Sequence, residues 1–155
     1  MSYPMTLPEA PGRRQAGRRR SRGFSLIEIA VVVAISGILA SVAYPSYQNQ
    51  VRNSRRADAQ SVLMQAAEFL ERHYTENLRY DASATGTAVA LPAALSEAPR
   101  EGATKYYTVS LESVTPSTYL LRAVPKGAQA SDSCGTLKLD NVGAKTAVLA
   151  TCWQR

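Results

Sequence analysis

The chain has 155 residues, which is enough for one domain with a hydrophobic core. Its formal net charge of +6 would suggest a protein that binds polyanions, but residues 1–23 hold six of the arginines and a single acidic residue, Glu9. This leader therefore accounts for +5 of the charge, and the rest of the chain is close to neutral. The basic composition is no argument for a nucleic-acid-binding domain, and no specific nucleic acid partner is predicted.

The leader, residues 1–23, is rich in proline, glycine and arginine and has no apolar periodicity. This composition predicts a disordered segment, because it cannot bury enough apolar surface to fold. A run of arginines directly before an apolar helix keeps that end of the helix in the cytoplasm. We therefore expect the leader to set the orientation of the segment that follows it.

Residues 24–44 are almost entirely apolar. Their number, about 20, matches the length of a helix that spans a bilayer. The exception is Glu28, whose carboxylate is unfavourable in hydrocarbon unless it has a partner. The segment thus predicts a transmembrane helix with one residue, Glu28, whose charge is unfavourable in lipid without a partner.

Pro45 would normally kink or end a helix, yet a helical pattern continues beyond it to about Tyr74. Residues 45–74 are predicted to form the amphipathic half of one long helix, which needs a partner along its apolar face. The apolar positions that recur at steps of three and four are Ala59, Val62, Leu63, Ala66, Ala67, Leu70 and Tyr74.

Residues 75–104 lose the periodicity and contain several prolines and glycines, so we expect a long connecting loop with at most a short helix near Pro92. Residues 105–155 then alternate apolar and polar side chains, at 107–111, 119–123 and 137–139. This pattern predicts an antiparallel sheet of three or four strands whose apolar face packs on the amphipathic half-helix. The fold class expected from the sequence is therefore α+β.

The two cysteines, Cys134 and Cys152, lie close to the C-terminus. A cytosolic chain could keep them as free thiols, whereas an exported chain more often joins them. A disulfide here would close a loop of about 18 residues and stabilise the fold by roughly 3 kcal/mol. We predict the disulfide.

The sequence gives no indication of catalysis or of a cofactor. His73, the single histidine, lies within the amphipathic helix, where packing is the usual role of such a residue. Asp132 and Asp140 are too sparse to indicate calcium, and neither metal-ligand spacing nor a nucleophile motif is present. We expect a non-enzymatic protein without cofactor or metal.

Three arginines, Arg52, Arg55 and Arg56, follow the apolar segment closely. The simplest interpretation is a solvated collar just outside the membrane. Contacts with other subunits are the alternative, and DNA binding is disfavoured because the chain beyond the leader is nearly neutral.

Residues 23–28, Gly-Phe-Ser-Leu-Ile-Glu, resemble the class III signal motif of type IV pilins. The resemblance extends to the basic leader, the long helix, the connecting loop, the antiparallel sheet and the C-terminal cysteine pair. Pro-Ser-Tyr-Gln at 45–48 and the sequences around Cys134 and Cys152 are most similar to minor pilins of the PilE-like group. The resemblance implies the pilin fold and a structural role in pilus assembly, and so in motility or adhesion.

The same resemblance implies roles for individual residues. A prepilin peptidase would cut between Gly23 and Phe24 and methylate the new amine of Phe24. Glu28 would then pair with the Phe24 ammonium of a neighbouring subunit and set the stagger between helices. The implied partners are the prepilin peptidase, other pilins and minor pilins, and the inner-membrane assembly platform. The implied location is the bacterial inner membrane, crossed once with the C-terminal domain in the periplasm, and then the pilus fibre.

Two alternatives remain open. Ser41-Val42-Ala43 has the small-x-small form that signal peptidase I recognises, and a cut after Ala43 would release a soluble periplasmic protein. A pseudopilin of a type II secretion system would share the helix and the Gly23–Phe24 cut, although its major class usually carries a calcium site in place of a cysteine pair.

Overall fold

The computed structural model describes residues 24–153, and Gly23 and the rest of the leader lie outside this range. One helix, α1 (Leu26–Asn77), takes up 52 of these residues and continues through Pro45. It ends three residues beyond Tyr74, where Leu78 adopts a positive φ of 55° and donates its amide to the carbonyl of Tyr74. A left-handed residue of this kind is a common way for a helix to stop.

The chain divides into two compact units, Met1–Ala40 and Ser41–Arg155. The described part of the first unit is residues 24–40, and all but the first two of these residues belong to helix α1. The second unit contains the remainder of α1 together with all the strands.

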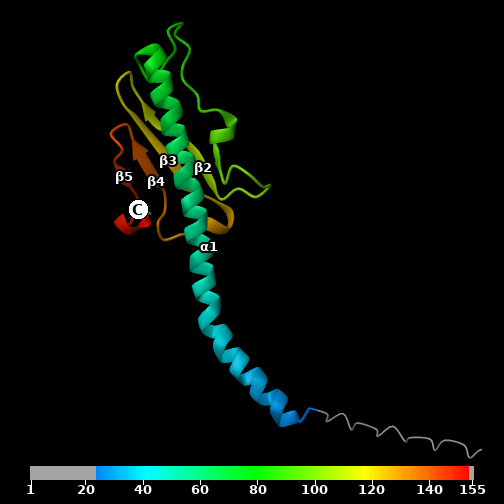
Figure 1. Ribbon diagram of the computed structural model, residues 1–155. Coiled ribbons are helices and arrows are strands. Elements are labelled where there is room, and N and C mark those ends of the chain that lie inside the picture. The colour runs from blue at the N-terminus through cyan, green and yellow to red at the C-terminus, as the bar shows by residue number, and fades with distance from the viewer. Residues whose placement is uncertain (1–23, 154–155) are drawn as a thin grey trace, which may run out of the picture. The chain divides into compact units, whose positions relative to one another are not determined.

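The second unit holds one antiparallel sheet with the strand order β1-β2-β3-β4-β5 (Figure 1). Its long strands are β2 (Tyr107–Val114), β3 (Tyr119–Pro125) and β4 (Leu137–Asp140), which coincide with the three alternating segments of the sequence. Two edge strands of two residues each, β1 (Glu97–Ala98) and β5 (Lys145–Thr146), bring the total to five. The predicted α+β class is confirmed, and the sheet has one strand more than the three or four expected.

Three short 3-10 turns complete the secondary structure of the described residues. The first, η1 (Ala93–Leu95), lies where the sequence suggested a short helix. The others, η2 (Gly127–Gln129) and η3 (Ala150–Cys152), flank the last two strands.

The core lies between the second half of α1 and one face of the sheet (Figure 1). The helix contributes its recurring apolar positions from Ala59 to Leu70, of which Ala67 is only partly buried, whereas Tyr74 is exposed. The strands contribute every second residue, as in β3, where Tyr119, Leu121 and Ala123 are buried. Full burial of each large apolar side chain is worth about 1.5–3 kcal/mol. The large side chains that are fully buried include Leu63, Leu70, Tyr107, Leu121 and Leu137.

A polar contact also joins the helix to the sheet near the end of α1. Glu71 accepts hydrogen bonds from the hydroxyls of Tyr80, at 3.0 Å, and Tyr119, at 3.1 Å. Burial, reinforced by the hydrogen bond to the Glu71 carboxylate, raises the pKa of Tyr80 to about 12. His73, two residues further along α1, has its Nε2 3.1 Å from the carbonyl oxygen of Ala82.

Candidate functional site

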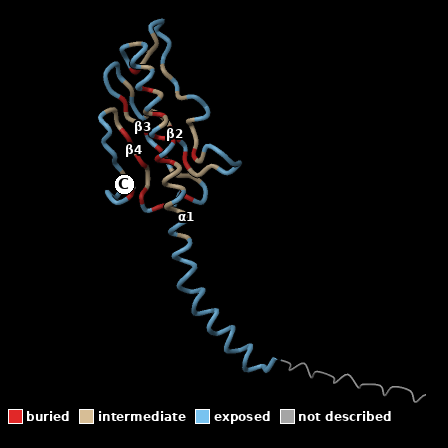
Figure 2. The backbone as a smooth tube through the Cα atoms, in the orientation of Figure 1, coloured by how far each residue is buried: buried red, intermediate tan, exposed pale blue. Residues whose placement is uncertain are grey.

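The first turns of α1 carry a continuous apolar surface that nothing in the described chain covers. Every residue from 24 to 47 is exposed, and Phe24 and Leu26 are 78% and 91% exposed (Figure 2). The helix is long and apolar enough to cross a membrane, with a mean hydropathy of 2.5 in its most apolar window. An apolar surface of this size is stable only in lipid or against other proteins.

Glu28 lies in the first turn of α1 and is exposed. The partial positive charge at the start of a helix favours a carboxylate at this place. Within residues 24–153 no cation forms an ion pair with Glu28. The structure thus brings Glu28 to the same end of α1 as Phe24, while Gly23 lies outside the described residues.

In the first half of the amphipathic segment 45–74, Arg56 forms an ion pair with Asp132. The Arg56 Nε donates to Asp132 Oδ2 at 2.7 Å, and Nη2 donates to Oδ1. The side chain of Asp132 is completely buried and that of Arg56 is 15% exposed. The interpretation of Arg56 as part of a solvated collar is therefore wrong, because its side chain is mostly buried and paired. No local pattern could predict this pair, because Asp132 lies 76 residues away in sequence.

This ion pair belongs to a buried polar network. Tyr107 donates its hydroxyl to Asp132 at 3.3 Å, and Gln129 donates its amide to the Tyr107 oxygen and to the carbonyl of Arg52. Burial alone would raise the pKa of Asp132, but the hydrogen bonds and charge of Arg56, with those of Tyr107 and Gln129, hold this pKa below its ordinary value. Burial raises the pKa of Tyr107 to about 12. The network therefore stabilises a charged Asp132.

The C-terminal loop is attached to α1 by the same region of the helix. Cys134 and Cys152 form the predicted disulfide, with their Cα atoms 5.6 Å apart. Gln60 donates its buried amide to the carbonyl of Cys152 at 2.8 Å, and Asp132 precedes Cys134 by two residues. Both ends of the disulfide loop are thus fixed to α1, a connection between distant residues that no local sequence pattern predicts.

The outer face of the sheet, opposite α1, carries a row of polar side chains. The strand register aligns Ser110, Arg122, Lys138 and Thr146 across four strands. The Arg122 Nε donates to Ser110 Oγ at 3.1 Å, and Lys138 forms an ion pair of 2.7 Å with Glu112. This row carries two basic side chains, one of which is already paired.

Family models match both parts of the chain. Residues 18–44 match the prokaryotic N-terminal methylation motif, and residues 45–138, more than half of the chain, match the model described as type IV minor pilin ComP, DNA uptake sequence receptor. The chain belongs to this type IV pilin family. The methylation motif covers the exposed apolar surface described above, and the second model covers most of the folded unit.

Individual relatives agree with this assignment. The fimbrial protein EcpC of Eikenella corrodens is 50% identical over 38 residues, which are 24% of this chain and 25% of that protein. The type II secretion system core protein G of Dickeya chrysanthemi is 34% identical over 68 residues, 44% of each chain. The matched segments span about a quarter of the length of the first curated relatives.

A solved structure extends the sequence similarity over a longer stretch. A type IV pilin from Shewanella oneidensis is 34% identical, and the match covers 67% of this chain and 99% of that one, with a TM-score of 0.49.

Proposed function

We propose that this pilin is a minor pilin, a structural subunit required for the priming or extension of a type IV pilus. Its precursor is held in the bacterial inner membrane by residues 24–44, with the folded unit in the periplasm. A prepilin peptidase cuts between Gly23 and Phe24 and methylates the amine of Phe24. The mature subunit then leaves the membrane and joins other pilins at the assembly platform, and the chain itself catalyses no reaction.

The observation that carries this proposal is the exposed apolar surface of α1 with a single carboxylate in its first turn. An apolar helix alone would be a simple anchor. Glu28 makes residence in lipid less favourable. A carboxylate at the centre of a membrane helix costs about 2.5–3.5 kcal/mol on insertion scales, and this value is an upper limit for Glu28, which lies in the first turn. Pairing with the Phe24 ammonium of a neighbouring subunit neutralises this charge and fixes the axial register of two helices.

The N-terminus of the mature protein tests the processing step. Mass spectrometry of the chain isolated from its native host should find N-methylated Phe24 as the first residue. A mature protein that begins at Tyr44 would instead support cleavage by signal peptidase I and refute the pilin pathway. Replacement of Gly23 by a bulky residue should leave the uncut precursor in the membrane.

The assembly step is tested separately by Glu28→Ala, with Ser36→Ala as a matched control in the same apolar segment. Glu28→Ala should be cleaved normally but be reduced in sheared pilus fractions, whereas Ser36→Ala should be incorporated as the unmodified chain is. Normal incorporation of Glu28→Ala would remove the proposed role of this carboxylate.

The similarity to a type II secretion core protein keeps a pseudopilin role as an alternative. Deletion of the gene separates the two roles. Loss of surface filaments with normal enzyme secretion supports the minor pilin, and the reverse pattern supports the pseudopilin.

The description of the matched family favours a second candidate function, the binding of DNA for uptake. In this chain the row across the outer sheet face offers Arg122 and Lys138 to phosphates. Fluorescence anisotropy with labelled duplex DNA at 50–200 mM salt tests this function. If the row binds DNA, Arg122→Ala and Lys138→Ala should each reduce the salt dependence by about one counterion. Absence of binding by the unmodified chain at low salt would exclude it.

A further inference from the structure

Two tyrosines stand on the surface of α1 directly after the apolar segment. Tyr44 and Tyr47 are each 67% exposed, and a spacing of three residues places them on neighbouring parts of the helix surface. The Tyr44 hydroxyl accepts a hydrogen bond of 3.1 Å from Gln48 Nε2. The two rings extend the exposed apolar surface of residues 24–43 along α1, and their hydroxyls add hydrogen-bonding groups at its end.

The position of Tyr44 along the helix matches the edge of a bilayer. The 20 residues that separate Tyr44 from Phe24 rise about 30 Å as an α-helix, which is the thickness of the hydrocarbon core. Tyrosine is enriched at the level of the lipid headgroups, because its ring is apolar and its hydroxyl forms hydrogen bonds. The hydroxyls of Tyr44 and Tyr47 would therefore reach the headgroups when residues 24–44 span the membrane.

A basic side chain, Arg52, lies eight residues beyond Tyr44 on α1. Tyr44, Gln48 and Arg52 are four residues apart in succession, so they lie in one row along α1. Arg56 is paired with Asp132, and the Arg55 guanidinium lies 3.8 Å from the centre of the Tyr106 ring. Among the described residues, no carboxylate forms an ion pair with Arg52.

We propose that Tyr44, Tyr47 and Arg52 form a headgroup anchor, a surface that binds the phospholipid headgroups on the periplasmic side of the inner membrane. The two tyrosines occupy the boundary between hydrocarbon and headgroups, and Arg52 contacts the lipid phosphates. This inference rests on the proposed membrane-bound precursor and adds a specific contact between the folded unit and the membrane.

The order of residues favours lipid over a second copy of the chain as the occupant. An apolar segment, an aromatic pair and a cation follow one another along α1, and a bilayer presents hydrocarbon, a mixed boundary and phosphate in the same order. An apolar helix from another subunit would complement the tyrosines, but it would leave the Arg52 charge without a partner.

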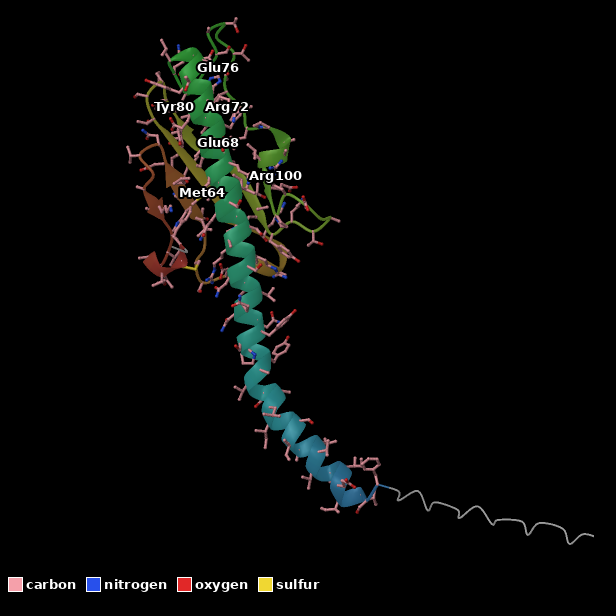
Figure 3. The ribbon with its side chains drawn as sticks, viewed as in Figure 1. Met64, Glu68, Arg72, Glu76, Tyr80 and Arg100 are labelled. Carbon is pink, nitrogen blue, oxygen red and sulfur yellow. A yellow bond between two sulfur atoms is a disulfide. The ribbon has the colours of Figure 1, made fainter. Side chains whose placement is uncertain are left out.

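Depth-dependent fluorescence quenching tests the anchor in the full-length precursor. The chain is reconstituted at a low protein-to-lipid ratio in vesicles of phosphatidylethanolamine and phosphatidylglycerol that contain a spin label at a shallow or a deep acyl position. Tyr44→Trp and Tyr47→Trp serve as reporters. Met64→Trp, on an exposed part of α1 within the folded unit, is the control (Figure 3). Each signal is the difference from the unmodified chain, because Trp153 is retained.

We expect the two reporter tryptophans to emit at shorter wavelength than Met64→Trp and to lose more fluorescence to the shallow label than to the deep one. Quenching of the reporters by aqueous iodide, to the extent seen for Met64→Trp, would overturn the anchor. Protection from both lipid labels and iodide would also overturn it, because that result places Tyr44 and Tyr47 against another protein copy.

The contribution of Arg52 is tested by Arg52→Glu in the Tyr47→Trp chain, with Arg122→Glu as the control on the outer sheet face. Arg52→Glu should reduce quenching by the shallow label, and Arg122→Glu should not. Equal quenching in both variants would refute the phosphate contact.

Extraction with alkaline carbonate separates a failed anchor from a failed membrane precursor. A chain that resists extraction but leaves its reporters in water refutes only the anchor. A chain that is extracted refutes the membrane-bound precursor itself.

Discussion

Replacement of Arg56 by methionine should strongly destabilise the folded unit. The substitution keeps the apolar stem of the side chain and removes the two hydrogen bonds to the buried Asp132 carboxylate. Removal of one partner of a buried ion pair typically costs about 3–5 kcal/mol. A domain of this size has a total stability of about 5–15 kcal/mol, so the unfolding midpoint should fall by roughly 10–20 °C.

Thermal or urea unfolding of the full chain in mild detergent, followed by the fluorescence of Trp153, measures this loss. Arg122→Met is the matched control, since Arg122 is exposed and its replacement should change the free energy of unfolding by about 0.5 kcal/mol or less. A loss for Arg56→Met no larger than for Arg122→Met would refute the reasoning. The double variant Arg56→Met with Asp132→Leu should recover part of the stability, because no unpaired charge is then buried.

The effect should also depend on pH with a defined sign. The pKa of Asp132 is lowered in the folded chain, so its contribution is present above the unfolded pKa of about 3.9 and is lost as pH falls through the folded value. Without Arg56, burial raises this pKa and the carboxylate takes up a proton more readily. The difference between Arg56→Met and the unmodified chain should therefore be largest near neutral pH. It should begin to shrink as pH falls through the raised Asp132 pKa of the variant, and continue to shrink until pH falls below the lowered pKa of the unmodified chain.

Three further substitutions test other contacts of the folded unit by the same unfolding measurement. Cys152→Ser should lower the free energy of unfolding by about 3 kcal/mol under oxidising conditions, and addition of a reductant should bring the unmodified chain to the same value. Gln60→Ala leaves the buried Cys152 carbonyl without its donor and should cost about 1–3 kcal/mol. Replacement of Gln65, whose side-chain hydrogen bonds are exposed, should cost far less. Tyr119→Phe removes one hydrogen bond to Glu71 and should cost about 0.5–1.5 kcal/mol; an unchanged midpoint would show that the remaining donor to this carboxylate suffices.

The long elements of the fold could be predicted because their signal repeats many times. The three- and four-residue steps between Ala59 and Leu70 appear as buried positions on α1, and the alternation in β2, β3 and β4 appears as burial of every second residue. The strands β1 and β5 were missed because two residues are too few to show an alternation. The exact end of α1 depends on one left-handed residue, Leu78, whose type gives no warning of that conformation.

In the candidate site, too, residues within a contiguous motif could be predicted and residues paired only by the tertiary fold could not. Phe24 and Glu28 belong to a contiguous motif and could be identified from the sequence, as could the Cys134–Cys152 disulfide. The Arg56–Asp132 pair could not, since charge alone suggests solvation and the partner is supplied only by the tertiary fold. The roles of Phe24 and Glu28 in processing and assembly remain predictions for the experiments above.

The double attachment of the C-terminal loop has a consequence for protein engineering. The disulfide, the Arg56–Asp132 pair and the Gln60 amide all act on the two ends of the loop, whereas the turn at Val142 and Gly143 is exposed and contributes no core residue. An epitope tag or a fluorophore-binding peptide inserted between Val142 and Gly143 should therefore leave the fold intact. Such an insertion would provide a label on the folded unit that does not alter the helix needed for assembly.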